Sequence, residues 1–488
     1  MGIVQSQTLK NTITTYLGFG IGAINTLFLY TEFMSETYYG LITYIFSTAY
    51  VMMPLLAFGA HNTIIKFYSS YKTRNSINSF LTWMLLLPLL LIIPMGLIGH
   101  FSFETISHFL SQRNPIVKDY VWLIYVSAIA FSYFEVFYAW TKVHMNSVFG
   151  NFLMEVFHRA GIAIILLCLY FEVIDIETFI YAAVGVYVLR TLAMMMYAFY
   201  VRRPMFRLGK FPNMVAVFKY SAIIILAGSV ANIILEVDKF MIGQFIEIEN
   251  VAYYGVAIYI ATVIGVPARS MHQITNPITA KFINEKNKQG LKDLYKKSSL
   301  NLFIISGFIF LLIILNIKQL YHLIPIEYAG GLMVVLLISV AKLSDNIIGN
   351  NNAILFNSDY YRVVLALGVL LAIMTVVFNM LLIPKYGING AGFATFMSIV
   401  VYNTAKVGFV YFKYKMSPFC ANTFKALILI FFFSVIFYFW DFSFHPIINI
   451  GIKSLLIGIS YGLIVYKMNL SEDITLLFDK LLKKTSRQ

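Results

Sequence analysis

The chain has 488 residues, of which 60% are hydrophobic and only 12% are charged, and its mean hydropathy is +0.78. Soluble domains carry about 25% charged residues, so this composition excludes an ordinary water-soluble protein. The formal net charge is +14, but the bases are spread over many connections between apolar runs. This distribution argues against nucleic acid as a partner.

Fourteen apolar runs are long enough to cross a bilayer as helices. They are continuously apolar and do not alternate with period two, which argues against a transmembrane β-barrel. The connections are too short to hold a soluble domain. We place the spans at 12–30, 39–60, 80–99, 120–141, 156–174, 179–200, 214–236, 251–275, 299–316, 328–349, 361–383, 388–411, 424–440 and 447–466.

The charges of the connections alternate in sign along the chain. If the N-terminus is cytoplasmic, most lysines and arginines face inward, whereas outward segments such as "FEVIDIET" and "FIEIEN" are acidic. This asymmetry follows the positive-inside rule. We therefore expect a multi-pass protein of the bacterial inner membrane with both termini in the cytoplasm. The inward basic segments are 66–74, 202–210, 281–297, 413–415 and 480–487.

A short motif occurs twice at equivalent places. Tyr38-Tyr39-Gly40 opens the second span and Tyr253-Tyr254-Gly255 opens the eighth, a shift of 254 − 39 = 215 residues. The pair Lys66-Phe67 recurs at the same shift. Spans 1–6 and 7–12 therefore look like two copies of one unit. The sequence predicts an all-α integral membrane fold with two pseudo-symmetric six-helix lobes, residues 1–212 and 213–415, followed by two further helices and a cytoplasmic tail in 416–488.

Three segments resemble those of a known family. They are "ILEVDKFMIGQFIEIENVAYYGVA", "NMLLIPKYGINGAGFAT" and the opening through "YYGLITYIFSTAYVMMPLLAFGAHNTIIKFY". They are similar to helix connections and opening helices of the bacterial polysaccharide and O-antigen flippases in the multidrug/oligosaccharidyl-lipid/polysaccharide exporter superfamily. The resemblance covers the first twelve helices. It implies a MATE-like, V-shaped exporter that flips undecaprenyl-pyrophosphate-linked oligosaccharides by alternating access.

An anionic lipid headgroup needs a wet cavity with cationic walls. Ionisable groups inside spans cost roughly 2.5–3.5 kcal/mol each and are therefore functional candidates. Arg190 lies deep in the sixth span, and it either faces the cavity or pairs with Glu135 or another acid. Arg269 and His272 share a helix face and either face the cavity or approach the cytoplasmic interface. The candidate substrate-binding residues are Arg190, Arg269, His272, Lys342, Arg159 and Lys406.

The acids Glu135, Asp238, Asp345 and Glu32 are the candidates for coupling or gating. The resemblance implies that Asp238 stabilises the outward ends of the lobes or serves a coupling cation. We favour the alternative that Asp238 and Glu32 are solvated at the interface. Lys342 and Asp345 are three residues apart, and we favour an internal salt bridge between them.

Several function classes are disfavoured. The sequence contains no P-loop, metal-binding helix or nucleophile elbow, so we expect neither an enzyme nor a cofactor, and coupling to a proton or sodium gradient is left open. The alternatives are a MATE-type drug or cation exporter, a peptidoglycan lipid-precursor flippase and, less favoured, a membrane polysaccharide polymerase or ligase. We expect a monomer that binds lipid-linked oligosaccharide and membrane lipids. Association with polysaccharide assembly proteins is open.

Overall fold

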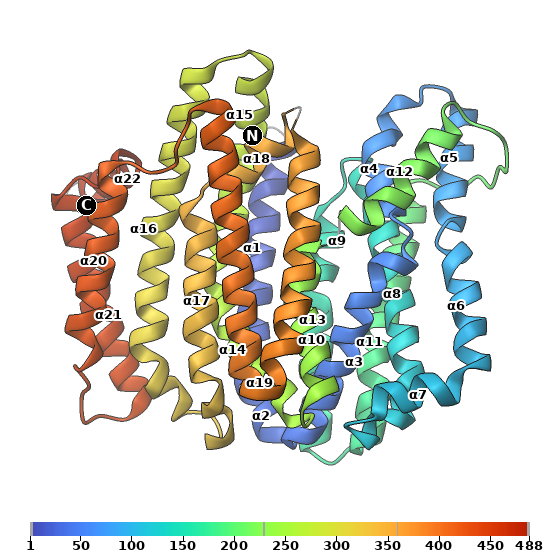
Figure 1. Ribbon diagram of the computed structural model, residues 1–488, viewed down its shortest axis with the longest axis horizontal. Coiled ribbons are helices and arrows are strands. Elements are labelled where there is room, and N and C mark those ends of the chain that lie inside the picture. The colour runs from blue at the N-terminus through green and yellow to red at the C-terminus, as the bar shows by residue number, and fades with distance from the viewer. Residues whose placement is uncertain (1–2, 228–229, 359, 486–488) are drawn as a thin grey trace. The chain divides into compact units, whose positions relative to one another are not determined.

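The structure, a computed structural model, describes residues 3–227, 230–358 and 360–485 (Figure 1). These residues are largely helical and contain no strand. The chain separates into two compact units. Unit 1 comprises Met1–Gly255 and Asn379–Gly387, and unit 2 comprises Val256–Phe378 and Ile388–Gln488. The predicted lobe boundaries at residues 212 and 415 stay predictions.

Unit 1 is built from thirteen consecutive helices within the described residues. Two π-helical turns, Asn25–Leu29 and Leu153–Phe157, continue α1 and α9 respectively. The helices are α1 (Ile3–Ile24), α2 (Tyr30–Phe33), α3 (Glu36–Leu56), α4 (Ala60–Phe67), α5 (Arg74–Leu86), α6 (Leu89–Phe101), α7 (Phe103–Ser111), α8 (Val121–Lys142), α9 (Val148–Phe152), α10 (His158–Tyr170), α11 (Ile176–Val201), α12 (Met214–Ala227) and α13 (Val230–Phe245).

Unit 2 contains the later helices. Two helices, α14 (Glu249–Thr262) and α19 (Tyr361–Tyr414), contribute residues to both units. Gly387 interrupts α19 with φ 57° and ψ −139°, a conformation that suits glycine. The others are α15 (Val266–Asn284), α16 (Lys288–Tyr321), α17 (Leu332–Ile347), α18 (Asn351–Phe356), α20 (Ala421–Tyr438), α21 (Pro446–Lys467) and α22 (Glu472–Thr485).

The described residues contain 12 helices that are long and apolar enough to cross a membrane. The predicted all-helical membrane fold is confirmed, but the count of fourteen spans is not. One reason is that α19 includes both the eleventh and the twelfth predicted spans. The other is that the predicted span 214–236 falls on two shorter helices, α12 and α13, and its residues 228–229 lie outside the described residues.

Polar caps begin several helices at the predicted connections. Thr73, Asp175 and Asn287 each accept a hydrogen bond from the backbone amide three residues later, at 3.3, 2.9 and 2.9 Å. Such caps satisfy amides that lack a partner inside the helix. They fix where α5, α11 and α16 start.

Helices α3, α8 and α11 pack against one another in unit 1, and α13 packs against α3. Glycines permit close approaches at α3. A Cβ atom on Gly40 would collide with the carbonyl of Ile248, and one on Gly243 would collide with the Tyr44 ring. Gly255, the counterpart of Gly40, lies against Thr43. The two copies of the repeated motif therefore meet within unit 1.

Candidate functional site

Arg190 is buried in unit 1 among aromatic rings. Its side chain is 3% exposed, and its guanidinium carbon lies 4.2 Å from the centroid of Phe134 and 4.8 Å from that of Tyr187. The Nε atom has no hydrogen-bond partner in the described part of the chain. Cation–π contacts compensate part of the desolvation of a buried charge, but they leave the Nε donor without an acceptor.

The neighbourhood of Arg190 holds further charges without neutralising it. Tyr50 on α3 lies within electrostatic range of Arg190, Glu236 and Glu135. The predicted alternative of an Arg190–Glu135 ion pair is wrong, because the described residues show no ion pair for Arg190. Glu236 instead pairs with Lys239 at 3.1 Å.

Arg159 is held in an ion pair of its own helix. Its Nη1 lies 2.9 Å from Glu155 Oε2 and donates to the Glu155 carbonyl at 2.7 Å. The Arg159 carbonyl accepts from Asn25 Nδ2 at 2.7 Å, which joins the first π-helical turn to the start of α10. Arg159 therefore connects the end of α1 to α10. Because Glu155 neutralises its guanidinium, Arg159 is less available than Arg190 to an anionic cargo.

Unit 2 holds a second buried base. The Lys406 side chain is 1% exposed, and its Nζ donates to Asn352 Oδ1 at 3.1 Å and lies 4.0 Å from the Tyr402 ring centroid. Asp345 and His272 lie within electrostatic range of this base. Three of the predicted residues, on three different helices, therefore gather in one cluster.

The predicted Lys342–Asp345 salt bridge is wrong. Asp345 accepts from Asn403 Nδ2 at 2.8 Å, and within the described residues no ion pair joins Asp345 to Lys342. Spacing of three places both side chains on one helix face, but a donor on α19 takes the carboxylate. The Lys342 stem lies near Gly265. Arg269 is exposed, and neither predicted role is decided for it.

The two buried bases occupy related places in the two repeats. Tyr187 and Tyr402 are separated by 402 − 187 = 215 residues, the shift of the repeated motif. Arg190 lies one turn after Tyr187, and Lys406 lies one turn after Tyr402, each with its charge near that ring. We did not predict this correspondence from the sequence, although the shift of 215 residues contains the signal.

Asp238 is wholly buried, so the favoured prediction of a solvated side chain is wrong. Its exposure is 0%. Oδ2 accepts from the Tyr254 hydroxyl at 2.5 Å, and Oδ1 accepts from Asn379 Nδ2 at 2.7 Å. A carboxylate with neutral polar neighbours is a suitable oxygen ligand for a proton or a small cation. Glu32, in contrast, is exposed as predicted.

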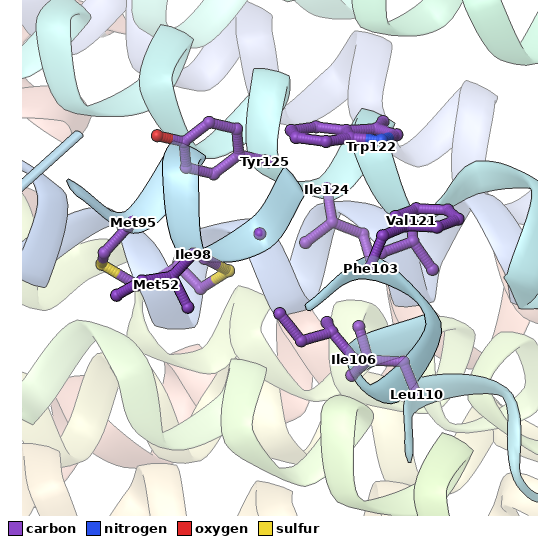
Figure 2. A pocket seen from close by; sticks show the side chains of 11 residues that line it. Met52, Met95, Ile98, Phe103, Ile106, Leu110, Val121, Trp122, Ile124 and Tyr125 are labelled. Carbon is purple, nitrogen blue, oxygen red and sulfur yellow. The ribbon is translucent and has the colours of Figure 1, made fainter. Parts of the chain in front are cut away.

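A separate apolar pocket of about 180 Å³ lies in unit 1. Figure 2 shows Trp122 and Tyr125 at the top, Met52 and Met95 at the left, and Ile106 and Leu110 below. None of the eleven side chains that line it is charged. The pocket suits hydrocarbon and does not suit an anionic headgroup.

The helix arrangement and the buried ionisable groups define a multi-pass membrane transporter. The model of the family described as polysaccharide biosynthesis protein matches residues 7–274, more than half of the chain, and the MatE model matches residues 224–340. The chain therefore belongs to the polysaccharide biosynthesis protein family, within the multidrug/oligosaccharidyl-lipid/polysaccharide exporter superfamily. Comparison with curated proteins found no match.

Solved structures share the fold at low identity. The lipid II flippase MurJ in an inward closed conformation has a TM-score of 0.72 at 13% identity, over 94% of this chain and 99% of that chain. An outward-facing multidrug resistance MATE transporter has a TM-score of 0.57 at 14% identity, over 85% and 96%. A MOP superfamily transporter from Pyrococcus furiosus has a TM-score of 0.58 at 14% identity, over 85% and 96%.

Proposed function

We propose that this protein flips an undecaprenyl-pyrophosphate-linked oligosaccharide across the bacterial inner membrane, with both termini in the cytoplasm. The observation that carries the proposal is Arg190, which is buried and has no carboxylate partner in the part of the chain that the structure describes. A buried unpaired cation is costly. An anionic headgroup supplies the missing charge and an acceptor for the free Nε atom.

The second repeat supports the same cargo class. Lys406 is as deeply buried as Arg190 and bonds to the neutral amide of Asn352. A site for cationic drugs requires buried carboxylates at the binding surface. Asp238 is such a carboxylate, but it is wholly buried against Tyr254 and Asn379, an environment that suits a proton or small ion better than a drug. The drug or cation exporter is therefore the weaker alternative.

The peptidoglycan lipid precursor is the second candidate cargo. The similarity to a lipid II flippase extends over 94% of this chain, whereas the multidrug transporter covers 85%. Both cargoes carry a polyprenyl pyrophosphate, so Arg190 does not discriminate between them. Transport of each fluorescent lipid in reconstituted vesicles separates the two candidates.

Asp238 is the residue that we assign to coupling. Binding of a proton or sodium ion between its carboxylate and Asn379 changes the charge that Tyr254 contacts. Since Tyr254 belongs to the repeated motif, this event acts where the two copies meet. Glu135 and Asp345 are half-buried and remain predicted gating residues. Glu32 also remains a predicted gating residue, although its exposure makes it a weaker candidate than Glu135 and Asp345.

The decisive experiment compares Arg190→Ala and Arg190→Lys in cells that depend on this protein for surface polysaccharide. We expect the alanine variant to accumulate lipid-linked units on the cytoplasmic side and the lysine variant to keep part of the activity, because lysine retains the charge but loses the planar fork. Arg113→Ala is the matched control, since this side chain is 52% exposed. Normal surface polysaccharide in Arg190→Ala at wild-type abundance would refute the assignment.

A further inference from the structure

The segment between α11 and α12 has an unusual surface. Residues 203–211 are neither helix nor strand, yet they follow directly after the span Ile176–Val201. Figure 1 shows this segment running beside α5 before it enters α12. We call residues 203–210 the basic finger. It lies outside the 12 candidate spans of the described residues.

Side chains of α5 hold the backbone of the basic finger. The Thr82 hydroxyl donates to the carbonyl of Met205 at 3.2 Å and accepts from the amide of Arg207 at 3.1 Å. The indole of Trp83 donates to the carbonyl of Gly209 at 3.3 Å. An irregular segment meets a membrane surface only when other groups satisfy its backbone. The finger meets this condition at three of its backbone groups.

The finger exposes large apolar side chains. Phe206 is 72% exposed, Leu208 is 69% exposed and Met205 is 50% exposed. Single exposed apolar residues need no explanation, but three within four positions of a connection form a patch. Anchored as they are, these side chains cannot turn inward to the protein core. The patch therefore requires an apolar partner.

The charges around the patch have one sign. Residues 202–220 contain five lysines and arginines, and residues 61–80 contain three, while neither stretch contains an aspartate or glutamate. Within the finger, Arg203, Arg207 and Lys210 are exposed. Arg74 at the start of α5 contacts the Met205 sulfur at 3.8 Å. Bases that alternate with apolar residues match a layer of anionic headgroups above acyl chains.

We propose that the basic finger binds the surface of an anionic phospholipid leaflet. Phe206 and Leu208 insert at the boundary between headgroups and acyl chains, and the three bases contact lipid phosphates. The start of the finger, two residues after the last residue of a membrane span, places it at the level of the headgroups, which favours lipid over a cytosolic protein. This function concerns bulk lipid and is independent of the cargo that the buried bases bind.

The test uses the full-length protein with C168S, C420S and F206C, labelled at position 206 with an environment-sensitive fluorophore. It is reconstituted in phosphatidylcholine vesicles with or without phosphatidylglycerol. We expect emission to shift to shorter wavelength with phosphatidylglycerol and to be quenched by lipids spin-labelled near the headgroup. Each base near an anionic surface raises the binding of a segment to that surface roughly fivefold. The variant R203Q/R207Q/K210Q should therefore lose the dependence of emission on phosphatidylglycerol.

A matched control places the same probe at Ile326, which is 70% exposed and adjacent to the acid Glu327. Its emission should not depend on phosphatidylglycerol. Emission at position 206 that reports water in both lipid mixtures would overturn the proposal. Protection that appears only after cytosolic protein is added would overturn it as well, and would identify the finger as a protein docking surface. Equal emission shifts in both lipid mixtures would show that the three bases of the finger do not contribute to binding, which would overturn the proposed preference for anionic lipid.

Discussion

Asn114 joins the connection after α7 to the turn between α13 and α14, and we predict that this side chain keeps the turn closed. Its Nδ2 donates to the carbonyls of Gly243 at 2.7 Å and Ile246 at 3.0 Å, and its Oδ1 accepts from the amide of Ile248 at 2.9 Å. The carbonyl of Gly243 is among the last of α13, which have no partner within the helix. One amide therefore satisfies three backbone groups at once.

The magnitude follows from these contacts. Asn114 is 6% exposed, so Asn114→Ala leaves two acceptors and one donor without a partner. At about 1 kcal/mol for each lost hydrogen bond, the closed turn loses ~3 kcal/mol. This change corresponds to a factor of about 100 in the opening equilibrium. Asn114→Asp should be at least as damaging, because a carboxylate would face two carbonyl oxygens.

Hydrogen exchange measured by mass spectrometry checks this prediction. The amide of Ile248 should exchange about 100-fold faster in Asn114→Ala when the turn recloses faster than the open amide exchanges. Arg113→Ala is the neighbouring control, because the Arg113–Glu247 pair at 3.4 Å has side chains 52% and 71% exposed and is worth about 1 kcal/mol or less. Unchanged protection of Ile248 in Asn114→Ala, or an equal effect of Arg113→Ala, would refute the reasoning.

Three further predictions follow. Asp238→Asn should abolish the dependence of transport on a proton or sodium gradient in vesicles. Glu32→Gln, which alters an exposed acid, should keep that dependence. Full gradient dependence in Asp238→Asn would contradict the coupling assignment. Hydrogen bonds from Thr178 lower the pKa of the Asp175 carboxyl. The cap of α11 should therefore persist above the usual carboxyl pKa and weaken as the pH falls through the lowered value. Hydrogen exchange at residues 176–179 should show this pH dependence for wild type and not for Asp175→Asn. Gly40→Ala should reduce the folded yield because its Cβ meets the Ile248 carbonyl, whereas Gly185→Ala, with open space around it, should not; equal yields of the two would count against the close approach.

Much of the fold is readable from local sequence. Lipid accepts apolar side chains wherever they are contiguous, so hydropathy alone places most of the spans, although some helices, such as α16, begin about ten residues before the predicted span. The repeated Tyr-Tyr-Gly motif predicts a duplication of spans, but it does not predict that Gly40 lies against the carbonyl of Ile248. The division of the seventh span into α12 and α13 was not predicted, since its apolar run continues without a strong breaker.

The sequence predicts less well which charged side chains form ion pairs. Spacing of three residues predicts that Lys342 and Asp345 share a helix face, but it does not predict that Asn403, 58 residues later, binds the carboxylate. Glu236 and Lys239, by contrast, have the same spacing and do form an ion pair. The outcome depends on which donors neighbouring helices present, and a single helix does not contain that information.

By itself, the sequence determined that this protein is helical and spans a membrane, because those properties depend on hydropathy and periodicity along one dimension. Tertiary structure alone decided that Arg190 lies among rings without an acid and that Asp238 is buried between Tyr254 and Asn379. The energy of a buried charge is set by atoms within a few ångströms of it. Those atoms come from helices far apart in the chain.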